Sequence, residues 1–312
     1  MSTDWSVADP VSELRYALAE AEADAGVDTE ESDLLTRALA RAAAERVPGH
    51  AIDPADRVSG TEAFERQTAV LRALLTELTD ADWSRPTVRD LDVQGLMGHL
   101  IGVESAFAAM LAGDTSAADA DHVASTQAAA EHEWTRTPQQ TMGSWLKALR
   151  QSLTALRLCD GGLPVRFHGM GLPLADLMTA RAFEIWTHAD DIRRALGLAT
   201  VDPEPQTLAT MTDLGVLLLP LALRAGHQGV AGNVRLVLTG PGGGTWDIRL
   251  GEAEVRRATL GSAFAAHVVA DTAEFCRVIA NRADLSSSGA IVREDRSAAD
   301  ALFTAAASLA LD

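Results

Sequence analysis

The sequence predicts a multidomain protein of mixed α and α+β class: a four-helix bundle, preceded by a helical hairpin and followed by a small α+β domain. Two observations support this. Between residues 61 and 200, long segments repeat apolar residues at helical spacing. After Gly232 the pattern changes to alternation around a glycine-rich turn, which is typical of a β-hairpin.

Domain boundaries follow from the same patterns. The 312 residues exceed the roughly 100–200 residues of a typical domain. We expect a helical extension over 1–60, the bundle over 61–200, and a linking helix with the α+β domain over 201–312. The extension is rich in alanine and acidic residues and has few large apolar ones, so an appended hairpin is expected there.

The bundle helices are expected where apolar periodicity is strongest, over roughly 64–78, 93–113, 139–158 and 173–197. Residues 114–127 are polar and alanine-rich, and they are expected to connect the second helix to the third. The fourth helix ends at Gly197, a residue type favoured just past a helix C-terminus.

The α+β domain is expected to begin after a linking helix over 206–225. Two alternating runs around the glycines at 242–244 predict a hairpin, because no helix or Gly-Lys-Ser/Thr follows as a phosphate loop would require. Further elements are expected as strands near 255–261 and 266–271, a helix near 272–282, a short strand near 287–295 and a final helix over 297–311.

Composition excludes some partners. The formal net charge is −18, and such a negative chain repels phosphate backbones, so nucleic acid is not an expected partner. No continuous apolar run approaches the roughly 20 residues of a membrane span, and the first residues carry no signal-peptide pattern. A cytoplasmic protein, monomeric or homodimeric, that does not bind membranes is therefore expected.

The two cysteines, Cys159 and Cys276, lie far apart and have no metal-binding spacing. We interpret them as reduced, packed thiols, because no neighbouring residue visibly activates either one. Any thiol chemistry in this protein is therefore expected to use an external thiol.

Three residues form a candidate metal site. Glu184 and His188 are four apart on the fourth predicted helix and share one face, where they could bind a cation or form only a surface contact. His99 shares a stripe with Leu96 and Leu100, so it points inward as a ligand or as a core histidine. Two imidazoles and a carboxylate with open positions are typical of a catalytic zinc site.

Asp191 follows His188 by three residues and could orient its imidazole, which gives it an indirect catalytic role. The alternative is a surface acid paired with Arg193 or Arg194. Glu104 follows His99 by five residues and is a poorer candidate for such a role.

The motifs VQGLMGHL and ARAFEIWTHADDIRRALG resemble the mycothiol-dependent maleylpyruvate isomerase family, of the DinB-like metal-binding bundles. The segments LVLTGPGGGTWDIRLG and ADALFTAAASLA are similar to the sterol-carrier-like second domain of that family. The resemblance covers roughly residues 62–312. It implies that His99, Glu184 and His188 bind zinc or another divalent metal, with mycothiol as cosubstrate.

Three further residues are candidates for binding or catalysis. Trp134 and His168 are interpreted as candidate contacts to the thiol or substrate, against the alternatives of packing for Trp134 and a solvated loop for His168. In the resembled family an arginine of the second domain holds the acidic substrate, and Arg257, or its neighbour Arg256, is the candidate here.

The function expected from these residues is a metal-dependent, mycothiol-using isomerase or thiol S-transferase that acts on a small, activated, acidic substrate. A hydrolase that activates water on the same three residues is one alternative. A non-catalytic binding or regulatory module is another, with the N-terminal hairpin as its partner surface.

Overall fold

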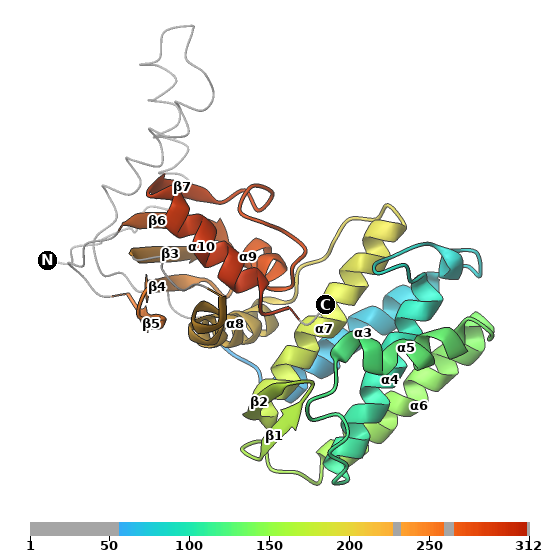
Figure 1. The fold of residues 1–312 in the computed structure, drawn as a ribbon. Helices are drawn as coiled ribbons and strands as arrows, with labels where there is room; N and C mark the ends of the chain where they lie inside the picture. The colour runs from blue at the N-terminus through green and yellow to red at the C-terminus, as the bar shows by residue number, and fades with distance from the viewer. Residues whose placement is uncertain (1–55, 227–231, 259–264, 311–312) are drawn as a thin grey trace, which may run out of the picture. The chain divides into compact units, whose positions relative to one another are not determined.

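The computed structural model describes residues 56–226, 232–258 and 265–310. These residues form a helical bundle and an α+β part, as predicted, each built around its own cluster of buried apolar side chains (Figure 1). Most of the predicted N-terminal extension over 1–60 lies outside the described residues.

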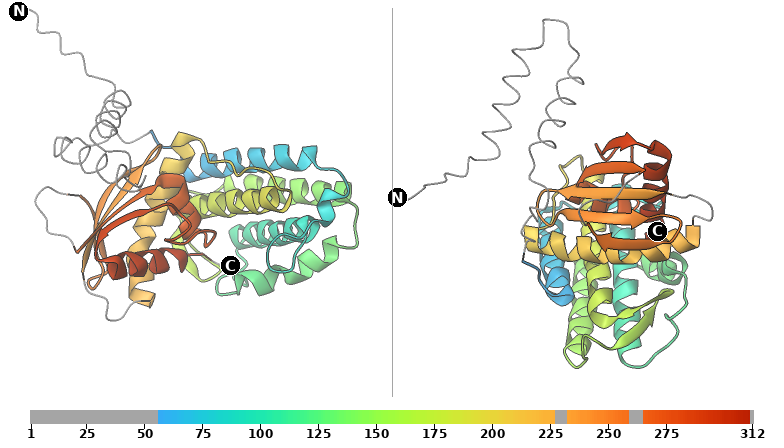
Figure 2. Two further views of the ribbon diagram at one scale, coloured as in Figure 1. Left: turned by 90° about the horizontal axis from the view of Figure 1, so that it is seen from above. Right: turned by 90° about the vertical axis from the view of Figure 1, so that its left-hand side faces the viewer.

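The four predicted bundle helices are confirmed. They are α3 (Gly60–Glu77), α4 (Val93–Leu111), α6 (Pro138–Leu156) and α7 (Leu174–Ala195). Side-chain caps begin three of them, since Ser59, Asp92 and Thr137 each accept a hydrogen bond from a first-turn backbone N–H. Helix α3 packs along α7, and α4 packs along α6, which places the apolar stripes in one core (Figure 2).

Helix α5 (His122–Glu133) is a correction to the sequence analysis, which places a polar connection over 114–127. The helix begins at the cap Asp121, which accepts a hydrogen bond from the backbone N–H of Ala124. Small residues dominate it, so no strong apolar stripe marks it in the sequence. It packs along α4 and buries His122 and Thr126.

A short hairpin precedes α7 where the sequence analysis places a loop. Strands β1 (Pro164–Phe167) and β2 (Met170–Pro173) pair antiparallel around His168 and Gly169. Both turn residues have positive φ, 47° and 79°, as a tight two-residue hairpin turn requires. Their backbone N–H groups donate to the carbonyls of Ala117 and Ala118, which fixes the turn against the α4–α5 connection.

The α+β part follows helix α8 (Pro205–Gly226) and confirms the predicted element order. Its five-stranded sheet has the order β5-β4-β3-β6-β7, with only β3 and β6 parallel. The elements are β3 (Asn233–Thr239), β4 (Gly244–Arg249), β5 (Glu254–Arg257), β6 (Ala266–Asp271), α9 (Thr272–Ile279), β7 (Ile291–Glu294) and α10 (Arg296–Ala307).

One face of this sheet is buried. Along β3 the side chains of Val234, Leu236 and Leu238 are fully buried, while the alternate residues stay partly exposed. Helices α8, α9 and α10 contact the sheet and supply the other half of this core (Figure 1).

Helix α8 is long and largely apolar, although polar residues such as Thr212 and Asp213 interrupt it. Among the described residues it is the one helix long and apolar enough, by length and composition, to cross a membrane. More than half of its apolar window is buried inside the protein, and Pro220 lies within it. Its hydrophobicity is explained by packing between the bundle and the sheet, because it contacts α7, α3 and α10.

Candidate metal centre

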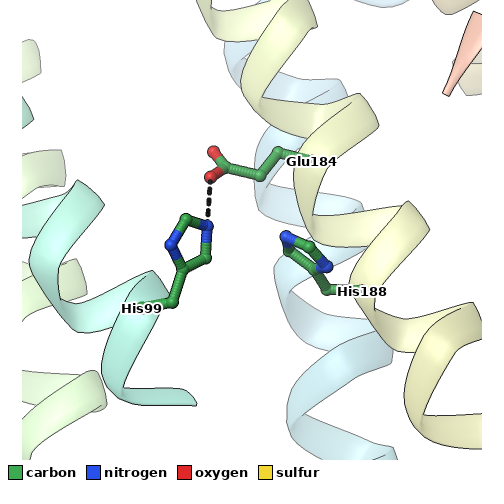
Figure 3. Close-up of side chains that lie close together, drawn as sticks. All are labelled: His99, Glu184 and His188. Atoms are coloured by element: carbon green, nitrogen blue, oxygen red, sulfur yellow. Dashed lines mark ion pairs between the residues drawn. The ribbon is translucent and has the colours of Figure 1, made fainter. Parts of the chain in front are cut away.

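Three predicted residues converge in the bundle. His99 comes from α4, and Glu184 and His188 come from successive turns of α7, so the two helices present them to one point (Figure 3). One potential ligand atom from each lies within 4.8 Å of the others. His99 Nε2 is 3.5 Å from Glu184 Oε1, and the His99 and His188 ring centroids are 5.3 Å apart.

Thr126 of α5 orients the His99 ring. Its Oγ1 lies 2.7 Å from His99 Nδ1, and the same hydroxyl donates to backbone carbonyls of its own helix, those of His122 and Val123. Because the hydroxyl hydrogen is used there, Thr126 accepts from His99 Nδ1–H. The lone pair of neutral His99 is therefore on Nε2, which faces Glu184.

Asp191 orients the His188 ring in the same way. Its Oδ2 is 3.1 Å from His188 Nδ1, and a carboxylate accepts, so Nδ1 carries the hydrogen and Nε2 is free to bind a metal. Asp191 is held in turn by two hydrogen bonds from Arg282, of 2.8 and 3.0 Å. Arg194, the alternative partner considered from the sequence, is 3.6 Å away and partly exposed.

The electrostatics of the site fit a bound cation. Burial lowers the pKa of His99 to about 4, so its imidazole is neutral at neutral pH. Burial acts to raise the pKa of Glu184, yet the contact with His122 and the charge of Arg181 outweigh it and hold the pKa well below its usual range. A buried carboxylate thus faces the neutral imidazole of His99.

Unsatisfied atoms point to the same conclusion. Among the described residues, His99 Nε2, Glu184 Oε1 and His188 Nε2 are all buried and have no hydrogen-bond partner. Such groups are costly to bury alone. One divalent cation would satisfy all three, because imidazole nitrogen and carboxylate oxygen are ordinary zinc ligands.

The sequence analysis missed His122, which belongs to the same cluster. It is buried at the start of α5, with Nε2 3.2 Å from Glu184 Oε1 and its ring 4.9 Å from that of His99. The weak periodicity of α5 hides it, since a histidine in a polar stretch gives no signal of burial. His122 lies four residues before Thr126, so both share one face of α5, and Thr126 hydrogen-bonds His99.

A cavity of about 100 Å³ opens beside Glu184 and His188. The predicted residue His168 lies on its wall, 5% exposed, with its ring 4.8 Å from that of His122. Most of the lining is apolar, from the bundle, α8 and the residues around α9; it includes Phe167, Leu214 and Ile279. The cavity therefore combines an apolar body with a polar end at the histidines.

Arg181 also lines the cavity and is nearly fully buried. It pairs with Glu104 at 2.5 Å and lies between the rings of Phe64 and Phe107, whose centroids are 5.2 and 4.8 Å from its guanidinium carbon. Burial raises the pKa of Glu104 despite the nearby guanidinium. Glu104 therefore pairs with Arg181, and it does not orient the His99 ring, which is bonded by Thr126.

Two candidate residues lie away from the triad. Trp134 is 45% exposed at the end of α5, where its Nε1 donates to Asp92, and it does not line the cavity. Arg257 on β5 stacks on Trp246 and contacts Asp213 at 3.3 Å, so the described structure does not bring it to the cavity. The α+β-part arginine that reaches toward a candidate ligand is Arg282, through Asp191.

The cysteines match their interpretation. Cys276 is fully buried, and burial raises the pKa of its thiol to about 12, which leaves no thiolate at neutral pH. Cys159 is partly buried, and its thiol lies 3.5 Å from the carbonyl of Ala155. Neither cysteine lines the cavity.

Comparison with known proteins agrees with this geometry. Residues 64–193 match the model of the mycothiol maleylpyruvate isomerase N-terminal domain. Over this range the chain is similar to that domain. The match spans His99, Glu184 and His188, and it confirms the resemblance that the motifs indicated.

Solved structures extend the similarity to the second domain. Crystal structures of the mycothiol-dependent maleylpyruvate isomerase and of a histidine-to-alanine mutant of it each align with a TM-score of 0.52 at 14% identity. The alignments cover 75% of this chain and 91% of the other, so the two-part fold is shared. Uncharacterized proteins from two strains of Mycobacterium tuberculosis are 25% identical over 229 residues, 70% of this chain and 82% of theirs.

Proposed function

We propose that this protein is a metal-dependent enzyme that uses mycothiol as a thiol cosubstrate, with His99, Glu184 and His188 as the metal ligands. The convergence of three buried, unpartnered ligand atoms from two helices carries the proposal. The N-terminal domain match supports the thiol, because relatives of that domain are named for mycothiol.

A divalent metal bound there would lower the pKa of a thiol ligand and so supply a thiolate near neutral pH. The chain's own residues prepare the site for it. Thr126 and Asp191 hold the two imidazoles with their Nε2 lone pairs facing Glu184. Three protein ligands leave a coordination position for an exogenous group, as catalytic sites require.

The cavity indicates what kind of substrate the thiolate would meet. Its apolar wall excludes water from the reacting groups, and Arg181 supplies positive charge at the polar end. A small, activated, acidic molecule suits this combination. The product is an isomer if the thiol is expelled again, or a thioether if the thiol remains attached.

The first experiment measures metal content. We expect about one divalent ion, preferably zinc, per purified chain and a near-complete loss in His188→Ala. His132→Ala is the matched control, because His132 is an exposed histidine of α5 outside the cluster. Full metal content in His188→Ala would contradict the proposed ligand set.

The second experiment tests the thiol. Isothermal titration with mycothiol should show binding to the metal-loaded protein and little or none after the metal is stripped. Equal binding by both forms would remove the role of the metal. Substrate turnover without any added thiol would instead favour hydrolysis on the same three residues.

A further inference from the structure

The hydrogen-bond roles of His168 are fixed by its surroundings. Its Nδ1 lies 3.2 Å from the backbone carbonyl oxygen of Ala120. A carbonyl oxygen can only accept, so Nδ1 carries the hydrogen. Burial, assisted by the neighbouring His122, lowers the pKa of His168 and keeps the ring neutral. Its Nε2 is therefore a hydrogen-bond acceptor.

That acceptor is unused within the protein. His168 Nε2 is buried and has no hydrogen-bond partner among the described residues, although the side chain lines the cavity. An unpaired buried nitrogen costs stability, which indicates that this nitrogen serves a ligand that enters the cavity.

His122 presents a second nitrogen of the same kind. Its Nε2 is 3.2 Å from Glu184 Oε1. The other ring nitrogen, Nδ1, is buried without a hydrogen-bond partner in the part of the chain that the structure describes. Two unpartnered ring nitrogens thus lie on neighbouring side chains of the cavity wall, one from α5 and one from the β1–β2 turn.

We propose that His168, with His122 beside it, accepts hydrogen bonds from O–H or N–H groups of the thiol cosubstrate, and so selects thiols that carry such donors. This inference rests on the proposed function. A carboxylate offers only acceptors and cannot satisfy these nitrogens, whereas mycothiol, a glycosidic thiol, carries hydroxyl and amide N–H groups. His122 contacts the candidate metal ligand Glu184, so it lies beside the residues that would hold the metal.

The test measures thiol binding to zinc-loaded, full-length protein by isothermal titration. His168→Asn removes Nε2 and keeps a residue type that tolerates positive φ. We expect about tenfold weaker mycothiol binding, the loss typical of one hydrogen bond, with zinc content unchanged. His132→Asn, at an exposed position of α5, is the matched control and should bind mycothiol as the wild type does. His168→Gln should restore part of the affinity, because its longer side chain can bring the amide oxygen to the position of Nε2, which the oxygen of asparagine does not reach.

A second probe identifies the contacted group. Ethanethiol has a sulfur and no O–H or N–H donor, so His168→Asn and the wild type should bind it equally. Equal weakening for both thiols, or none for either, would overturn the inference. Lactate carries a hydroxyl donor and propionate does not. If His168→Asn bound lactate more weakly than the wild type does, while its binding of propionate and mycothiol were unchanged, the donor would belong to the acidic substrate and the inference would be overturned. If zinc-loaded wild type fails to bind mycothiol, the proposed function itself falls.

Discussion

At the scale of single residues, the candidate metal centre depends on the side chains that orient the imidazoles. A histidine can bind a metal through either ring nitrogen, and the hydrogen bond at the other nitrogen decides which. Here Thr126 holds Nδ1 of His99 at 2.7 Å, and Asp191 holds Nδ1 of His188 at 3.1 Å. Both Nε2 atoms are thereby left free to bind one metal ion together with Glu184.

Replacing Thr126 by valine tests this orientation. Thr126→Val keeps the side-chain shape but removes the acceptor for His99 Nδ1–H, so metal affinity should fall about 10- to 100-fold. Competition with a chromophoric chelator would measure it. Thr212→Val, a buried hydroxyl that donates within α8, is the control and should leave metal affinity unchanged. Unchanged affinity in Thr126→Val would show that the His99 ring is fixed by packing alone.

At the scale of elements, α5 reaches the site because α4 has glycines where the two helices cross. A Cβ built on Gly98 would lie 2.6 Å from the Cα of Ala130 and 2.7 Å from the carbonyl oxygen of Ala129. A Cβ on Gly102 would lie 3.1 Å from the Cβ of Thr126. The absence of side chains lets the helix backbones approach closely, and this approach brings His122 and Thr126 to the ligands.

Gly98→Ala should therefore push α5 away, because the blocking atoms belong to its backbone. We expect a loss of about 1–3 kcal/mol in the free energy of unfolding, and weaker metal binding as Thr126 leaves His99. Gly143→Ala in α6 is the matched control, since nothing lies within 4 Å of its added Cβ. That variant should gain about 0.5–1 kcal/mol. Chemical denaturation and chelator competition measure both; normal stability in Gly98→Ala would contradict the close contact.

At the scale of the whole molecule, arginines of the α+β part form ion pairs with acidic residues of the bundle next to the candidate metal centre. Arg282, just after α9, donates two hydrogen bonds to Asp191, which holds His188. Arg277, within α9, donates to Asp190, whose other oxygen accepts from the backbone N–H of Val201. Asp190 and Asp191 are adjacent in sequence, yet of these two only Asp191 contacts a candidate metal ligand, His188.

Arg282→Gln should weaken metal binding, while Arg277→Gln should lower stability and leave metal affinity unchanged.

The pH dependence of stability gives a second test of the contact between Arg282 and Asp191. Burial tends to raise the pKa of Asp191, but the bonds from His188 and Arg282 outweigh it and lower the pKa to about 2. A depressed pKa stabilises the fold above the unfolded value near 4, and this is lost as pH falls toward 2.

Metal-stripped wild type should thus lose about 2 kcal/mol from this group between about pH 4 and pH 2, and Arg282→Gln should lose less. Denaturant unfolding across that range measures the difference. Identical pH profiles for Arg282→Gln and wild type would show that His188 alone sets the pKa of Asp191.

Local pattern in the chain is enough to predict the strongly periodic elements and the identity of the three candidate ligands. The four long helices and the β3–β4 hairpin follow from apolar spacing, and Glu184 and His188 share a face because a helix turns every 3.6 residues. Helix α5 and the β1–β2 hairpin could not be predicted, because their positions depend on contacts with α4 and on a tight turn.

Contacts between distant elements set the surroundings of the candidate ligands. Thr126 and Arg282 reach their partners from α5 and from the α+β part, at sequence separations of 27 and 91 residues. Arg257, the last residue of β5, instead stacks on Trp246 at the edge of the sheet. Periodicity records which face of an element is buried; it does not record which distant side chain that face meets, because packing between elements sets that contact.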